Sequence, residues 1–292
     1  MMFNQYNNTM KKKIIGKSGV ITLILIATLS LPDYGQSENS FISKYLNHLP
    51  GRFEKNNGDI LKYRMQAVYT NMDLYGNFSS KTKVTGEYTR GLPGDTVAWN
   101  NVYISGSASA AEPFKQGTKK EFMENFRYVP SPEMLTEGPF KDFPSSPENI
   151  FARNLVWDMF SFEIFAWNYF DSLKINTPYI IPDISGQFNM ADIGKYSHNK
   201  ITLCWNGVSV NNNVICAVID FTAIDNKLEI NMGQIKTKGT EQYWGSVMVS
   251  LKTKNIEQGV MYSGTIQEIE VTGMKDKFLV KTIRELVVNK IQ

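Results

Sequence analysis

The sequence has few of the side chains that usually carry catalysis. It holds two histidines, His48 and His198, and neither lies in a metal-binding pattern such as HxH or HExxH. It has no GxSxG nucleophile elbow, no GxxxxGK[ST] phosphate loop and no GxGxxG dinucleotide fingerprint. We therefore expect no metal and no cofactor, and the sequence favours a non-catalytic protein. A hydrolase that uses two carboxylates stays open, because spacing alone does not exclude one.

An excess of charge of one sign is also missing once the N-terminal segment is set aside. The whole chain has 31 Lys and Arg against 28 Asp and Glu, and residues 1–36 hold four of the lysines and one aspartate. The remainder therefore carries 27 residues of each sign. A nearly neutral chain gives no electrostatic reason to bind nucleic acid or an anionic membrane surface.

Residues 1–36 have the pattern of a secretory signal peptide. Four lysines between positions 11 and 17 precede an apolar stretch, Val20 to Leu31, and Gly35 offers a cleavage point. That stretch of about a dozen residues is shorter than the roughly 20 needed to span a membrane. A retained membrane anchor is the alternative. No cysteine follows the stretch before Cys204, so we expect an exported protein, periplasmic or extracellular, with no lipid anchor and no transmembrane segment in the mature chain.

The remaining residues, 37–292, show no internal repeat and no alternation of strands with helices, which favours a single domain. A helical, Pro-rich insertion interrupts it at about 106–175. Five prolines fall between Pro130 and Pro147, and a long irregular segment of this kind usually has a function or covers something. Three shorter helical features are expected: a helix near 37–49, another near 119–129, and a helix start at Ser145 or Ser146.

Strands dominate on both sides of the insertion. The run "LKYRMQAVYTN" alternates apolar and polar residues from Leu61, as a half-buried strand does. The last segment, 278–290, also fits a helix, but its β-branched content favours a strand. Three strands before the insertion and six after it predict a mainly β (α+β) fold. We expect a curved antiparallel sheet or open barrel of about nine strands, with an aromatic amphipathic helix on its concave face.

The two cysteines, Cys204 and Cys216, lie on neighbouring predicted strands in "ITLCWNGVSVNNNVICAVIDF". A turn near Asn211–Asn213 sets Cys216 opposite position 208 and Cys204 opposite position 220. The two are then about 13 Å out of step along the strands, whereas a disulfide needs Cα atoms within about 7 Å. Two small buried apolar side chains are one interpretation. A disulfide formed through a bulge or another strand is the other.

The predicted helix contains "NLVWDMFSFEIFAWNYF", Asn154 to Phe170, with eleven large apolar or aromatic residues and two acids. At 100° per residue its apolar side chains form one broad arc. The opposite arc holds Arg153, Asn154, Ser161, Asn168 and Asp171. These polar positions exclude a transmembrane span. The helix either fills the curved sheet or forms the wall of a site for a hydrophobic ligand.

Asp158 and Glu163 fall within or at the rim of the apolar arc. Carboxyl groups in apolar surroundings have raised pKa values and are frequent at functional sites. Alternatively, each one meets an arginine, a backbone amide or water. Tyr243 and Trp244 are adjacent in a strand, so one of them faces outward, where an exposed Trp can line a groove; core packing is the alternative. The candidate ligand-binding residues are Phe151, Leu155, Asp158, Phe162, Glu163, Phe165, Tyr169 and Trp244.

The run "ITLCWNGVSVNNNVICAVIDFTAIDNKLEI" resembles strand runs in exported bacterial envelope proteins that wrap a curved antiparallel sheet around a helix. The lipoprotein-carrier half-barrels belong to this class. The resemblance covers at most residues 200–290 and lies in the strand pattern, so no functional residue transfers. It implies a concave apolar face that binds an acyl chain, a lipid or another hydrophobic small molecule. A structural module of the cell envelope, with an envelope protein as partner, is the alternative.

Overall fold

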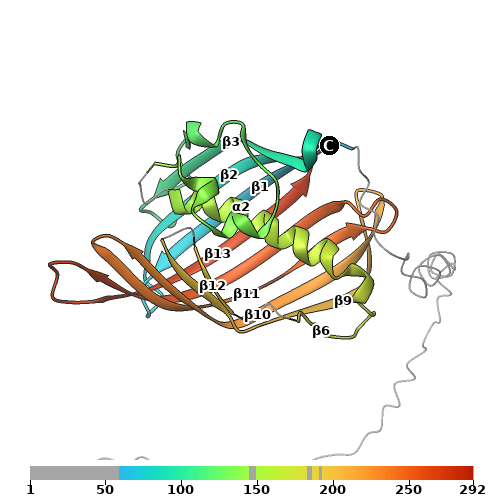
Figure 1. The fold of residues 1–292 in the computed structure, drawn as a ribbon. Coiled ribbons are helices and arrows are strands. Elements are labelled where there is room, and N and C mark those ends of the chain that lie inside the picture. Colours follow the sequence, from blue (N-terminus) through green and yellow to red (C-terminus); the bar gives the residue numbers. More distant parts are fainter. Residues whose placement is uncertain (1–58, 145–148, 183–185, 191–192, 292) are drawn as a thin grey trace, which may run out of the picture.

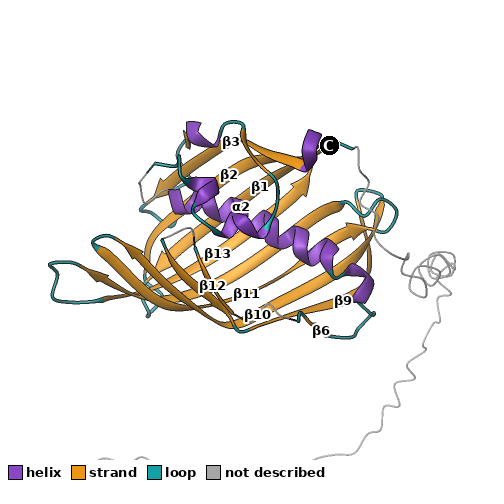
Figure 2. Cartoon of the chain, viewed as in Figure 1, coloured by secondary structure: helices purple, strands orange, loops and turns teal. Residues whose placement is uncertain are grey.

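A curved antiparallel sheet forms the body of the molecule and is not closed into a barrel (Figures 1 and 2). The computed structural model describes residues 59–144, 149–182, 186–190 and 193–291. Within these ranges thirteen strands share the sheet. The predicted fold class is confirmed. The predicted signal peptide, the expected helix near 37–49 and the expected caps at Ser145 and Ser146 lie outside the described residues.

Eight of the described strands are 12 to 19 residues long. They are β1 (Leu61–Met72), β2 (Phe78–Leu92), β3 (Thr96–Ser107), β9 (Lys200–Asn211), β10 (Val214–Met232), β11 (Ile235–Ser250), β12 (Ile256–Val271) and β13 (Phe278–Lys290). The other five have two to five residues. They are β4 (Thr118–Lys119), β5 (Phe126–Tyr128), β6 (Tyr179–Ile180), β7 (Gly186–Asn189) and β8 (Gly194–His198). The structure therefore has more strands than the expected count of about nine. Strands of two to five residues are too short to show an alternating pattern in the sequence.

The first and last long strands are neighbours in the sheet. The order is β4-β3-β2-β1-β13-β12-β11-β10-β8-β7, with β9 also paired to β10, β6 to β9 and β5 to β3. Pairing of β1 with β13 therefore joins the strands before the insertion to those after it. The ambiguous segment 278–290 is a strand, as its β-branched residues predicted.

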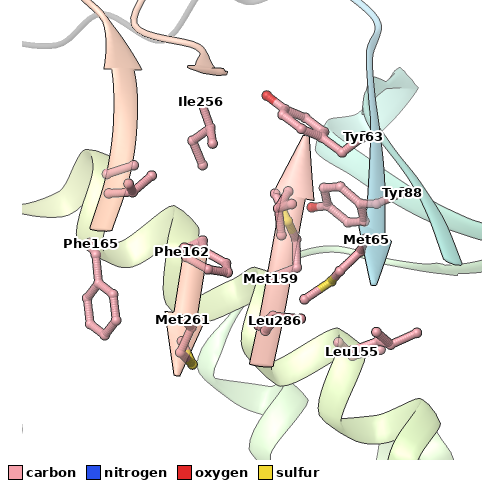
Figure 3. Packing of buried hydrophobic residues seen from close by; sticks show 14 of the residues in the cluster. Tyr63, Met65, Tyr88, Leu155, Met159, Phe162, Phe165, Ile256, Met261 and Leu286 are labelled. Atoms are coloured by element: carbon pink, nitrogen blue, oxygen red, sulfur yellow. The ribbon is translucent and has the colours of Figure 1, made fainter. Parts of the chain in front are cut away.

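One long helix crosses the concave face of the sheet (Figures 1 and 2). It is α2 (Asn149–Glu163), extended by a wider π-helical turn, η5 (Ile164–Asn168), and by a 3-10 turn, η6 (Phe170–Ser172). Its buried face packs Leu155, Met159 and Phe162 onto the middle strands, as Figure 3 shows. The helix thus fills the centre of the sheet.

The close approach of helix and sheet depends on glycine in β12. A Cβ atom placed on Gly259 would lie 2.7 Å from the Phe162 ring, so any side chain there would require the ring or the helix to move. Gly259 lies in register with Val247 of β11 and Val288 of β13. These inward residues form an apolar row under the helix.

The insertion covers the other side of the helix. Trp157 of α2 donates a hydrogen bond from Nε1 to the Met134 carbonyl oxygen at 2.9 Å, and the Arg153 guanidinium lies 5.0 Å from the centre of the Phe140 ring. Arg153 is therefore buried, although the helical wheel places it on the polar arc. The expected helix near 119–129 is wrong: this segment forms β4, a 3-10 turn and β5. Asn125 has a positive φ of 58°, which a right-handed helix does not allow.

Both cysteines are free, so the disulfide interpretation is wrong. Cys204 lies opposite Asp220, as predicted. Cys216 lies opposite Ser209, one position from the expected 208, because the register shifts between Val218 and Ile219. Cys216 is buried and Cys204 is half-buried, which fits their use as small packing residues.

None of the helices in the described ranges is both long enough and apolar enough to cross a membrane.

Candidate functional site

A cavity of about 980 Å³ lies between the helix and the concave face of the sheet. From the helix it is lined by aromatic and aliphatic side chains such as Trp157, Phe160 and Ile164. From the sheet it is lined by residues of β1 and β2 and of β7 to β13, among them Ile230 and Met261. Residues between Pro130 and Leu135 of the insertion also reach it. The Pro-rich segment therefore contributes to the wall of the cavity, in line with its expected covering role.

Four of the predicted site residues line this cavity: Phe151, Asp158, Glu163 and Phe165. The other four do not. Leu155 and Phe162 are fully buried between helix and sheet, and Tyr169 packs against Tyr179 with ring centres 5.8 Å apart.

Trp244 lies on the opposite face of the sheet from the cavity. It is 44% exposed and stacks on Tyr262, with ring centres 6.2 Å apart. Its neighbour Tyr243 lines the cavity, as strand alternation requires. The prediction that the two rings point to opposite faces is confirmed, and Tyr243 is the residue of this pair that lines the cavity.

Asp158 forms a buried ion pair with Arg284 of β13. The guanidinium Nη1 lies 3.0 Å from Oδ1 and 3.1 Å from Oδ2 of the carboxylate. Nη2 lies 4.0 Å from Oε1 of Glu241 on β11. Burial raises the pKa of Asp158 to about 6, Arg284 opposes this shift and Glu241 adds to it. One cation is therefore shared by two carboxylates at the cavity wall.

A tyrosine and a histidine extend this group along β8. The Tyr196 hydroxyl donates a hydrogen bond to Oε2 of Glu241 at 2.7 Å. The His198 ring packs edge-on to Tyr196, with ring centres 4.9 Å apart, and its Nδ1 lies 3.3 Å from Oδ1 of Asn226. Burial lowers the pKa of His198, so its ring is neutral at neutral pH.

Glu163 forms the second ion pair between helix and sheet. Its Oε2 lies 2.7 Å from Nη1 of Arg90, and its Oε1 accepts a hydrogen bond from the Tyr88 hydroxyl at 2.7 Å. The Arg90 guanidinium also lies 4.9 Å from the centre of the Trp167 ring. The interpretation that each helix acid meets an arginine is thus confirmed for Asp158 and for Glu163.

Two rows of polar residues cross the cavity floor over the adjacent strands β11, β12, β13 and β1. One row is Tyr243, Ser263, Arg284 and Tyr69; the next is Glu241, Thr265, Thr282 and Asn71. Along the strands, these polar rows lie next to the apolar rows under the helix. Sequence reasoning missed Glu241 and Arg284. The available signal was the alternation Thr282, Arg284, Leu286, Val288, which places an arginine on the buried face of β13.

Within the described residues, no three His, Cys, Asp or Glu side chains gather as a metal site would need.

Comparison with known proteins gives no family for the chain. No protein-family model matches it, and no curated protein matches it. Among solved structures it aligns with one described for lipid–protein interactions in lipovitellin, at a TM-score of 0.45 and 14% identity over 82% of this chain. The alignment spans about a quarter (26%) of that lipovitellin chain. A DUF1329 family protein from Desulfovibrio piger aligns at a TM-score of 0.14 and 9% identity, over 79% of this chain and 85% of the other.

Proposed function

We propose that this is an exported, non-catalytic protein that binds a hydrophobic small molecule between the helix and the curved sheet. The observation that carries the proposal is the cavity of about 980 Å³. Ligand sites are typically concave, mostly apolar and about 300–1,000 Å³ in volume.

The walls of the cavity suit an apolar ligand. The helix presents Phe160 and Ile164, and the sheet presents Ile230 and Met261 across from them. Covering apolar surface of this kind stabilises a complex by roughly 25 cal/mol per Å² removed from water, before the costs of association.

The state of the carboxylates argues against the hydrolase alternative. A general acid or base must reach a proton of the substrate. Both oxygens of Asp158 are held by Arg284, and the two oxygens of Glu163 are held by Arg90 and Tyr88. Each acid is thus occupied in fastening the helix to the sheet.

Export is supported by the composition of residues 1–36 alone. Mass spectrometry of the mature protein from its native cells should find that these residues have been removed near Gly35. A mature chain that retains the apolar stretch Val20 to Leu31 would show that the segment is an anchor.

Ligand binding is tested with protein stripped of bound lipid and titrated with the neutral fluorophore N-phenyl-1-naphthylamine. We expect a saturable rise in fluorescence. Ile230→Trp, which fills the cavity, should weaken binding by about tenfold or more, since it removes space for the probe. Ile224→Trp is the matched control, because Ile224 lies on the same strand and is exposed away from the cavity. No saturable binding, or an equal loss in both variants, would overturn the proposal.

A further inference from the structure

The polar floor of the cavity contains hydroxyl groups that have no hydrogen-bond partner among the described residues. Thr237, Ser263 and Thr265 line the cavity and are 5%, 2% and 7% exposed. Their side chains make no hydrogen bond with any described residue, whereas Thr282 beside them donates to Oδ1 of Asn71 at 2.8 Å. Buried polar groups are normally hydrogen-bonded, so these open hydroxyls fit a ligand with a polar end.

The charge around this floor is negative. Five charged residues line the cavity: Arg90, Asp158, Glu163, Glu241 and Arg284. Three are carboxylates and two are guanidinium groups, and each guanidinium lies within 3.0 Å of a helix acid. The carboxylate in excess is Glu241, which lies 4.0 Å from Arg284 and accepts a hydrogen bond from Tyr196.

This arrangement disfavours a ligand with a free carboxylate. Such a ligand would have to place its charge beside Glu241, and no cation among the described lining residues is left unpaired to receive it. Burying a charge without a partner is costly, and like charges repel more strongly in a partly dry cavity than in water. A cationic head group that donates hydrogen bonds would instead be attracted by Glu241 and could pair with the open hydroxyls.

We propose that the cavity selects an amphiphile with a single alkyl chain and a primary ammonium head. Glu241 is the counter-ion, and the hydroxyls of Ser263 and Thr265, on the strand beside it, accept the remaining two N–H groups. The alkyl chain lies against the apolar wall of the helix. This inference rests on the proposed function and names the ligand class for the same cavity.

The test is displacement of N-phenyl-1-naphthylamine by three ligands with one chain length: dodecylamine, 1-dodecanol and dodecanoic acid. At pH 7.5 the amine is protonated, like a lysine side chain with a pKa of about 10.4. We expect the amine to bind most tightly, the alcohol next and the acid most weakly, with about tenfold or more between amine and acid. Lysophosphatidylethanolamine separates two sources of the same head group, and its phosphate should make it weaker than the free amine.

Glu241→Gln keeps an acceptor for Tyr196 and removes the charge. It should abolish the advantage of the amine over the alcohol while the affinity for the alcohol stays unchanged. Glu285→Gln is the matched control, because Glu285 is exposed on β13 and does not line the cavity. Thr265→Val, which keeps the side-chain shape, should weaken the amine by a few fold.

The possible outcomes distinguish a failure of this inference from a failure of the proposed function. An acid that binds as tightly as the amine, or a Glu241→Gln protein that retains the preference, overturns the inference and leaves hydrophobic binding standing. If Glu241→Gln does not fold, an unchanged affinity of Thr265→Val for the amine would likewise overturn the inference. Failure of the probe and of all ligands to bind overturns the proposed function itself.

Discussion

The carboxylate of Asp158 on α2 and the guanidinium of Arg284 on β13 meet at 3.0 Å although 126 positions separate them in the chain. The pair connects the inserted helix to the last strand of the sheet. Arg284 also forms part of the cavity floor, where its Nη2 lies 4.0 Å from Oε1 of Glu241. The contact that holds the helix in place therefore also sets the charge of the cavity.

Removing the cation should cost more stability than removing the acid. Arg284→Met takes the shared cation from Asp158 and Glu241 and leaves the buried Asp158 without a partner, and breaking a buried pair in this way typically costs about 3–5 kcal/mol. Asp158→Asn leaves Arg284 with Glu241 nearby, so its cost should be smaller. The free energy of unfolding of the double variant, measured by urea denaturation, should be higher than that of Arg284→Met alone. An Arg284→Met protein as stable as the wild type would contradict this account of the pair.

The second ion pair depends on a tyrosine hydroxyl. Tyr88→Phe removes the donor that lies 2.7 Å from Oε1 of Glu163 and leaves a buried carboxylate oxygen without its hydrogen bond. The free energy of unfolding should fall by about 1–3 kcal/mol. Tyr103→Phe is the control, since Tyr103 is exposed on β3, and its unfolding midpoint in urea should match that of the wild type. Equal midpoints for Tyr88→Phe and Tyr103→Phe would show that Glu163 does not need this hydroxyl.

The sequence predicted those features that depend on local periodicity. The alternation from Leu61 and the helical arc around Phe162 follow from burial of one face of a strand or helix, and both are present. For the partners of Asp158 and Glu163 the sequence left three possibilities open, an arginine, a backbone amide or water, because contacts across 126 and 73 positions leave no periodic pattern. The site was predicted only in part for the same reason: four helix residues that line the cavity were named, whereas Trp157, Phe160 and Ile164 of the helix and Glu241 on the sheet were not.

Lys254 should make stability depend on pH in the alkaline range. Its ammonium is buried and lies 4.5 Å from the centre of the Phe170 ring, and burial lowers its pKa to about 8, against an opposing pull from Asp171. Between pH 8 and the ordinary lysine pKa of about 10.5, the unfolded chain binds more protons at this site than the folded chain does. Stability contributed by this group therefore rises with pH across that window.

Lys254→Met should remove this rise and should stabilise the protein at pH 7 by on the order of 1–3 kcal/mol. Lys252→Met, an exposed position in the same turn, is the control. Urea unfolding of the three proteins at pH 7, 8, 9 and 10 measures the effect, because other titrating groups cancel in the differences. A constant difference between Lys254→Met and the wild type across this range would contradict the prediction.

The position of the helix over the sheet should be sensitive to a single methyl group on β12. A Cβ at Gly259 would lie 2.7 Å from the ring of Phe162, inside the closest distance that packed carbons reach. Gly259→Ala should therefore destabilise the protein by about 1–3 kcal/mol through overpacking. Gly264→Ala, on the same strand, should have a much smaller effect, since its Cβ would meet only the Ile283 Cδ1 at 4.0 Å. Combining Gly259→Ala with Phe162→Leu relieves the clash, so the double variant should lose less stability than the sum of the two single variants in urea unfolding. Strict additivity would show that the methyl group acts on the strand backbone and not on the helix, and the lateral position of the helix would then be set by its two ion pairs.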